Sequence, residues 1–180
     1  MRLKKLTVLA FFTTLSLIIY TVESAIPPLV PIPGLKLGLS NIITLILLRN
    51  FSVKDTVLVQ LTRIFLASFL FGHAMSLIYS LAGGCLSLLV MVFVNAFLKQ
   101  RYLFITSCFG GIFHNIGQLF AAFCLTCTAG VLAYLPFLIL SGILTGLFTG
   151  LCAYFSQISL IPAIRKAVGT WFLKEPDDAD

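Results

Sequence analysis

The first candidates for a chemical role are two polar residues inside one apolar stretch. Gln60 and Arg63 lie about one helical turn apart, so they share a helix face and could donate hydrogen bonds to a carboxylate or phosphate. A charge within a membrane costs at least about 2.5 kcal/mol unless it is paired or hydrated. Arg63 could therefore bind a ligand, or it could form a structural pair with Glu23.

A second polar group lies in a later apolar stretch. His114 and Gln118 are four residues apart, with Asn115 beside His114. Such side chains should turn away from lipid, either to bind a ligand or to form hydrogen bonds between helices. The other histidine, His73, stands alone in a loop, so we expect no metal site, and nothing in the sequence predicts a cofactor.

A proline-rich stretch from Pro27 to Asn41 separates the first two apolar segments. Its four prolines remove backbone donors and fix φ, so the chain should run extended and enter a new helix near Leu35. Irregular backbone at a membrane is tolerated where protein buries it or where it lines a wet cavity. We expect this segment, which carries Lys36, to form the wall of a binding site; the alternative is a simple surface connection.

Small residues recur at every fourth position in two apolar segments. Gly142, Gly146 and Gly150 form one stripe, which predicts close helix packing. Ala10 and Thr14 have the same spacing near the start of the chain and could dock a second membrane protein.

Cys124 and Cys127 form a CxxC motif within an apolar segment. A redox pair is one interpretation. Two small buried residues are the favoured one, because no βαβ pattern surrounds the motif.

The composition defines the class of protein. Of the 180 residues 59% are hydrophobic and only 10% are charged, which is typical of an integral membrane protein. We expect one all-α transmembrane domain, residues 1–180, with a bundle of about six helices. These helices are predicted at about 6–22, 35–48, 56–71, 75–98, 103–128 and 131–154, followed by a polar tail at 165–180. The first is expected to be a retained helix and not a cleaved signal peptide.

The basic residues predict an orientation. Those expected on one face of the membrane are Arg2, Lys4, Lys5, Arg49, Lys54, Lys99, Arg101, Arg165, Lys166 and Lys174. Only Lys36 falls on the other face. Because basic loops stay in the cytoplasm, both termini should be cytoplasmic in a multi-pass protein of a bacterial inner membrane. The net charge of +6 is then a signal of topology, and no nucleic-acid partner is expected.

Five ordered motifs resemble one known family. The segments PIPGLKLGLSNI, RIFLASFLFG, SLAGGCLSLLVM, FHNIGQL and YLPFLILSGILTGLFTG are similar to motifs of the Gx transporter family, also called heptaprenyl diphosphate synthase component I. That family is in turn similar to the substrate-binding S components of energy-coupling factor transporters. The resemblance implies a six-helix protein that captures a small vitamin-like molecule from outside and associates with a transmembrane coupling protein and ATPase subunits.

The resemblance also selects candidate residues. The positions that fall in the matching motifs are Pro33, Gly34, Lys36, Asn41, Arg63, His114, Asn115 and Gln118. Docking through small residues of the first helix would use Ala10 and Thr14, where an alanine pair is usual in the S components. The chain has no Gly-rich, Lys-containing phosphate loop, so ATP hydrolysis would need a partner.

The second family name implies an enzyme, but the residues disfavour catalysis. Prenyl diphosphate synthases hold magnesium diphosphate with DDxxD motifs. Here the nearest match is Asp177, Asp178 and Asp180, whose spacing differs and which lie in the tail. A non-catalytic membrane subunit of a heptaprenyl diphosphate synthase, serving menaquinone side-chain synthesis, is therefore the alternative function.

Overall fold

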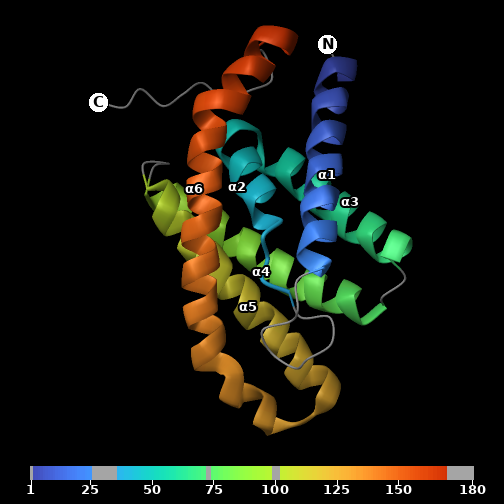
Figure 1. Ribbon diagram of the computed structural model, residues 1–180, viewed down its shortest axis with the longest axis vertical. Helices are drawn as coiled ribbons and strands as arrows, with labels where there is room; N and C mark the ends of the chain where they lie inside the picture. The colour runs from blue at the N-terminus through green and yellow to red at the C-terminus, as the bar shows by residue number, and fades with distance from the viewer. Residues whose placement is uncertain (1, 26–35, 72–73, 99–101, 170–180) are drawn as a thin grey trace.

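The computed structural model describes residues 2–25, 36–71, 74–98 and 102–169, and all regular secondary structure in these ranges is helical (Figure 1). The elements are α1 (Arg2–Ser24), α2 (Asn41–Asn50), α3 (Val53–Phe71), α4 (Ala74–Phe97), α5 (Leu103–Thr126), the 3-10 helix η1 (Ala129–Tyr134) and α6 (Leu135–Val168). The expected all-α class agrees with this architecture.

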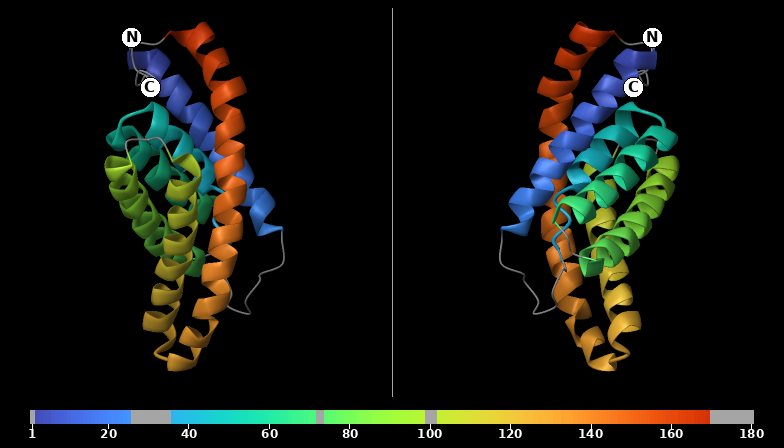
Figure 2. Two further views of the ribbon diagram at one scale, coloured as in Figure 1. Left: turned by 90° about the vertical axis from the view of Figure 1, so that its left-hand side faces the viewer. Right: turned by 90° about the vertical axis from the view of Figure 1, so that its right-hand side faces the viewer.

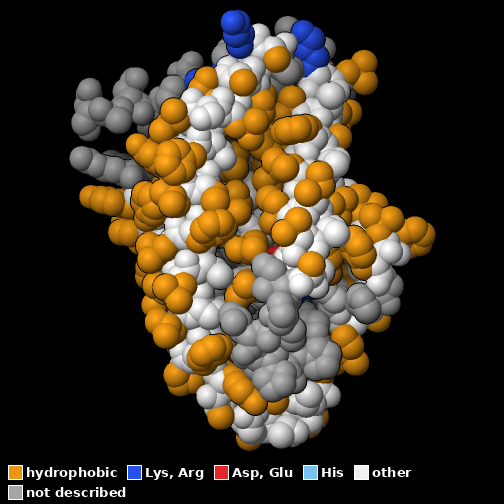
Figure 3. All heavy atoms as spheres, in the orientation of Figure 1, with side chains coloured by type: hydrophobic (Ala, Val, Ile, Leu, Met, Phe, Trp, Pro, Cys, Tyr) orange, Lys and Arg blue, Asp and Glu red, His pale blue; other side chains and the backbone are white. Residues whose placement is uncertain are grey.

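The helices α1, α2, α5 and α6 run along the long axis of the molecule in alternating directions, while α3 and α4 cross it obliquely (Figures 1 and 2). The start of α1 and the end of α6 therefore lie at the same end, which we call the basic end because Lys4, Lys5, Arg165 and Lys166 belong to these helix termini. In Figure 3 the blue side chains gather there, while hydrophobic side chains cover the flanks below. The connection through η1 lies at the opposite end.

Four helical segments are long and apolar enough to cross a membrane: Leu3–Ser24, Ala74–Phe97, Leu103–Thr126 and Ala129–Ala167. The 10 residues of α2 span only about 15 Å, half of a bilayer core of about 30 Å. The helix α3 is longer but carries charged residues. Six α-helices are thus present in the described part of the chain, which agrees with the expected number, and four segments there have the length and composition of a membrane span.

The second helix begins later than expected, at Asn41 and not near residue 35. Lys36 and Leu37 are not helical, and a turn follows in which the Asn41 amide donates to the Gly38 carbonyl at 2.9 Å. Gly38 has a φ of +85°, in the left-handed region, so it cannot continue a right-handed helix. Pro33 and Gly34 lie outside the described residues.

The sixth helix continues past the expected end at Tyr154 and runs to Val168. Pro162 lies inside it without ending it. Arg165 and Lys166, which we expected in a polar tail, form its last turn, where basic side chains complement the helix dipole. The fifth helix ends two residues earlier than expected, where Cys127 adopts a left-handed conformation with φ 49°.

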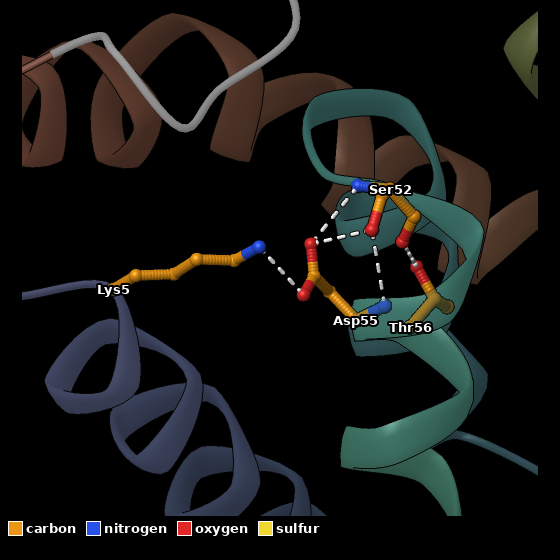
Figure 4. A network of polar contacts seen from close by, with 4 residues as sticks. All are labelled: Lys5, Ser52, Asp55 and Thr56. Atoms are coloured by element: carbon orange, nitrogen blue, oxygen red, sulfur yellow. Dashed lines mark hydrogen bonds and ion pairs between the residues drawn. The ribbon is translucent and has the colours of Figure 1, made fainter. Parts of the chain in front are cut away.

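The start of α3 is fixed by a capping box (Figure 4). The Asp55 amide donates to Ser52 Oγ at 3.2 Å, and the Ser52 hydroxyl donates to Asp55 Oδ2 at 2.6 Å. The Ser52 amide also donates to Asp55 Oδ2, at 3.3 Å. These contacts satisfy backbone donors that a helix start leaves free, which explains why α3 begins at Val53 and not near Thr56 as expected.

The same carboxylate joins α3 to α1. Lys5 Nζ lies 2.8 Å from Asp55 Oδ1, and this ion pair is drawn in Figure 4. Burial alone would raise the pKa of the Asp55 carboxyl. The hydrogen bonds from Lys5 and Ser52 outweigh burial and hold that pKa below its usual value.

The apolar core lies toward the basic end. It combines residues of α1, α2, α3 and α6, and its fully buried members include Phe12, Ile43, Phe51 and Ala153. Phe12 and Phe51 meet edge to face with ring centroids 5.7 Å apart. Most residues of α2 are buried, so this short helix is the centre around which the longer ones pack.

The helices α5 and α6 approach each other closely along the glycine stripe. A Cβ atom at Gly142 would lie 2.8 Å from Ile112 Cα, and one at Gly146 would lie 2.5 Å from Cys108 Cα. Ser107 and Thr149 add a hydrogen bond of 2.6 Å between their hydroxyls. The two backbones are in contact because these positions have no side chain.

Candidate functional site

The turn before α2 is held by a buried carboxylate from α1. Glu23 is 4% exposed, and its Oε1 accepts a hydrogen bond of 2.6 Å from the Gly38 amide. A Cβ at Gly38 would lie 2.5 Å from His114 Cδ2, so the turn rests directly on the His114 ring of α5. Both the positive φ and this contact require glycine.

Arg63 approaches the same turn from α3. It is 3% exposed, and its Nη1 donates to the Ser40 hydroxyl. Its Nη2 is buried and has no hydrogen-bond partner among the described residues. No direct ion pair joins Arg63 to Glu23 within the described residues, but their opposite charges attract each other across the turn. The direct contact between Arg63 and Glu23 that the sequence suggested is therefore not formed in the described residues. The backbone of the turn lies between the two side chains.

His114 and Gln118 of α5 complete the arrangement. Gln118 Nε2 lies 2.9 Å from His114 Nε2, and Gln118 Oε1 accepts a hydrogen bond of 3.1 Å from the Lys36 amide. Gly83 of α4 leaves room for them, since a Cβ there would lie 2.8 Å from Gln118 Cγ.

Asn41, the first residue of α2, follows directly on Ser40. It is 2% exposed, and in the part of the chain that the structure describes neither the oxygen nor the nitrogen of its amide has a hydrogen-bond partner. We use the name inner polar cluster for the set Glu23, Ser40, Asn41, Arg63, His114 and Gln118.

Gln60 lies one turn from Arg63, but both the oxygen and the nitrogen of its amide form hydrogen bonds with other residues of the protein. Thr44 Oγ1 donates to Gln60 Oε1 at 2.5 Å, and Gln60 Nε2 donates to the Gly84 carbonyl at 2.7 Å. Gln60 therefore connects α2, α3 and α4.

Asn115 is directed to α6 and not to the turn that Arg63 contacts. Its Nδ2 donates to the Leu138 carbonyl at 2.8 Å and contacts Ser141 Oγ at 3.2 Å, both on α6. One residue along a helix rotates the side chain by about 100°, so Asn115 faces α6 while His114 faces the turn.

The side chain of Lys36 is directed toward α1. Its Nζ is 2.5 Å from Ser24 Oγ and 3.2 Å from the centroid of the Tyr20 ring, a cation–π contact. Tyr20 in turn shares a hydrogen bond of 2.8 Å with Ser76 of α4. Tyr20, Ser24 and Ser76 were not predicted from sequence, although Tyr20 and Ser24 have the four-residue spacing of one helix face.

The remaining candidates lie at the surface. Ala10 and Thr14 are exposed on α1. Cys124 and Cys127 are free and exposed, so the interpretation of two buried small residues is wrong for them.

A model of the family described as heptaprenyl diphosphate synthase component I matches residues 12–156, most of the chain. The chain belongs to this family. The resemblance to the Gx transporter family, another name for the same family, is therefore confirmed. No curated protein and no solved structure matches the chain. The region matched by the heptaprenyl diphosphate synthase component I model includes all six residues of the inner polar cluster.

Proposed function

We propose that the chain is a non-catalytic, substrate-binding membrane subunit of an uptake transporter, similar to the S components of energy-coupling factor transporters. The observation that carries this proposal is the inner polar cluster, in which Arg63 Nη2 and both polar atoms of the Asn41 amide are buried without partners in residues 2–25, 36–71, 74–98 and 102–169. The alternating helices, the start of α1 and the end of α6 at one end, and the hydrophobic flanks agree with a multi-pass protein of the bacterial inner membrane.

Burial of polar groups without partners is costly, about 1 to 3 kcal/mol for each group. Buried polar groups in proteins almost always have a partner, so the exceptions need an explanation. A ligand that accepts from Arg63 and bonds to Asn41 would supply one. The backbone at residues 36–40 is irregular within the bundle, as expected where it lines a binding site.

Energy for uptake would come from partner proteins, because the sequence contains no phosphate loop of the Walker type. We propose a transmembrane coupling protein and ATPase subunits as these partners. The exposed residues Ala10 and Thr14 of α1 are candidates for the contact.

Purification of the tagged protein at its native level, followed by native mass spectrometry, tests this function. We expect ATPase subunits and a bound small molecule to accompany the wild-type protein. Arg63→Ala should lose the small molecule but keep the subunits, while Lys166→Ala, an exposed change at the basic end, should keep both. Recovery of the wild-type protein without any ATPase would contradict the proposal.

One observation favours a second function. The family description names a component of heptaprenyl diphosphate synthase, so the chain could be a non-catalytic membrane subunit of that enzyme. The residues for magnesium diphosphate binding would then belong to a partner. Analysis of quinone side chains in a deletion strain separates the two functions. Altered chain lengths would favour the synthase subunit, and unchanged chain lengths the uptake protein.

A further inference from the structure

Two of the five cysteines lie together where α5 ends. Cys124 belongs to the last turn of α5, and Cys127 is the residue that follows the helix at its C-terminal end. Both thiols are free and exposed, and every residue from 124 to 130 is exposed as well. The pair therefore lies at the end of a candidate membrane span, opposite the basic end (Figures 1 and 2).

The other three cysteines have different surroundings. Cys108 and Cys152 are half-buried inside α5 and α6, and Cys85 is exposed in the middle of α4. A side chain halfway along an apolar span faces lipid, since about 16 Å of helix lies on each side of it. Water-borne reagents should thus reach Cys124 and Cys127 more readily than the other three.

The backbone at Cys127 does not explain why a cysteine occurs there. Its φ of 49° and ψ of 27° are left-handed, and no other non-glycine residue of the described chain has a positive φ. The left-handed residue after a helix is usually Gly and sometimes Asn, because other side chains are strained in this conformation. Strained residues of this kind tend to occur at functional sites. The reason for a cysteine at this position is therefore to be sought in its thiol.

The two cysteines have the spacing that a disulfide needs. The Cys127 amide donates to the Phe123 carbonyl at 2.9 Å, so the helical turn extends as far as the Cys127 nitrogen. Residues three apart in such a turn have Cα atoms about 5 Å apart, within the range of about 4.4 to 6.8 Å that disulfides require. The Cys127 side chain also folds back onto this turn, with its Sγ 3.6 Å from the Cys124 carbonyl oxygen. The Cys127 sulfur is thus already directed toward Cys124.

We propose that Cys124 and Cys127 are a redox site, a pair of thiols that closes reversibly into a disulfide across the end of α5. The oxidant is a second disulfide, from a small thiol compound or from an exported protein. One cysteine thiolate attacks that disulfide, forms a mixed disulfide and releases one thiol. The other cysteine attacks the mixed disulfide, and the second half of the oxidant leaves as a thiol. Two cysteine protons and two electrons are thereby transferred to the oxidant.

The position of the pair agrees with this chemistry. Disulfides form and persist outside the cytoplasm, where thiols are not kept reduced. The loop charges predict that the basic end is cytoplasmic, which puts the end of α5 outside. The redox site goes beyond the proposed uptake function and does not depend on it. Because maleimide reacts only with the thiol form, labelling of this pair in intact cells follows a rinse with a membrane-impermeant reductant.

Oxidised glutathione tests the pair on the purified full-length protein in mild detergent. Cys85, Cys108 and Cys152 are replaced by alanine, the two remaining cysteines are reduced, and submillimolar oxidised glutathione is added. We expect intact mass spectrometry to show the loss of two hydrogens without bound glutathione, and dithiothreitol to restore both thiols. The internal disulfide should exceed the glutathione adduct by about tenfold or more, because the second exchange step is intramolecular.

Three variants in the same background connect this result to the spacing. Cys124→Ser and Cys127→Ser should each retain one bound glutathione. The third variant moves one thiol: Cys124→Ser with Leu125→Cys leaves two exposed cysteines two residues apart, which point to different sides of the helix. It should give glutathione adducts in place of the internal disulfide. If the alanine background does not fold, peptide mapping of the oxidised wild-type protein identifies which cysteines are joined.

Each other outcome decides against the redox site. Glutathione adducts on both cysteines, without the internal disulfide, would show that the end of α5 does not allow closure. Disulfide-linked dimers would assign the thiols to a contact between two copies of the chain. Unreacted thiols would show that a water-borne disulfide does not reach them. An equal yield of internal disulfide in the variant with the moved thiol would show that the bond reflects a loose segment and not the spacing of this pair.

Discussion

Gly38 occupies a position at which two independent constraints exclude a side chain. Its φ of +85° is strained for other residues, and a Cβ would overlap the His114 ring at 2.5 Å from Cδ2. We expect Gly38→Ala to lower the free energy of unfolding by about 1 to 3 kcal/mol for the backbone alone, with the ring contact in addition. Thermal unfolding in detergent measures the loss.

Gly130 provides the matched control for this change. A Cβ there would meet nothing closer than 3.7 Å, so Gly130→Ala should leave the melting temperature nearly unchanged. Combining Gly38→Ala with His114→Ala should recover part of the loss, because the ring is removed. If the double variant loses as much stability as the two single variants lose together, the ring contact is not the cause.

Glu23 and Arg63 should depend on each other for stability. Glu23→Gln removes the opposite charge that acts on the buried Arg63 guanidinium across the turn, so it should lower the melting temperature. Arg63→Met should be similarly harmful. The double variant should be more stable than either single variant, since it leaves no buried charge. Strict additivity of the two losses in a double-mutant cycle would show that the charges are not coupled.

At the scale of helices, the start of α3 combines a cap with an ion pair. The Asp55 carboxylate has a lowered pKa, so it stabilises the fold above its unfolded-state pKa, and this stabilisation is lost as the pH falls through the folded-state value. Asp55→Asn should therefore lower the melting temperature at neutral pH. The difference from wild type should shrink below about pH 4. Lys54→Ala, an exposed neighbouring change, should show no such convergence.

The contact between α5 and α6 predicts a graded response to added methyl groups. At Gly146 a Cβ would lie 2.5 Å from Cys108 Cα, and backbone cannot move aside easily. At Gly150 the nearest atom is Phe104 Cδ1, 3.0 Å away on a side chain. Gly146→Ala should thus cost about 1 to 3 kcal/mol, and Gly150→Ala clearly less. Thermal unfolding of both variants measures this order, and equal losses would contradict it.

Apolar runs and their flanking charges predicted the existence, order and class of the helices, because a membrane-length apolar segment has few other conformations. The start of α3 was predicted three residues too late, although Ser52 and Asp55 have the spacing of a capping box in the sequence. The start of α2 was not. It depends on the conformation of Gly38 and its contact with His114, which lies far away in the sequence.

The inner polar cluster was predicted in part for a similar reason. The cost of burying polar groups correctly indicated that His114, Gln118 and Arg63 turn inward. This cost does not tell toward which neighbouring helix a buried side chain points. It therefore could not predict that Asn115 contacts α6 or that the Lys36 ammonium contacts Tyr20. These directions follow from the packing of neighbouring helices and not from local sequence.

Across the whole molecule, the inner polar cluster lies between apolar groups along the long axis. The largest apolar cluster of the described residues gathers near the basic end, around α2, while two smaller ones, around Leu119 and Leu138 and around Tyr79 and Ala122, pack against η1 at the other end. A membrane protein that takes a polar molecule from one side only would need a packed interior between the polar cluster and the other side. The prediction from loop charges places the basic end in the cytoplasm, so the polar half should open outward.

Native cysteines provide the test of this orientation. Cys124 and Cys127 are exposed where α5 ends, opposite the basic end (Figures 1 and 2). In a variant with alanine at Cys85, Cys108 and Cys152, a membrane-impermeant maleimide added to intact cells should label the protein. If Cys124 and Cys127 are replaced as well and a single cysteine is introduced by K4C, labelling should require permeabilised cells. The reverse pattern would place the inner polar cluster toward the cytoplasm. The large apolar cluster around α2 would then face a ligand that arrives from outside. Uptake from outside would thereby be excluded.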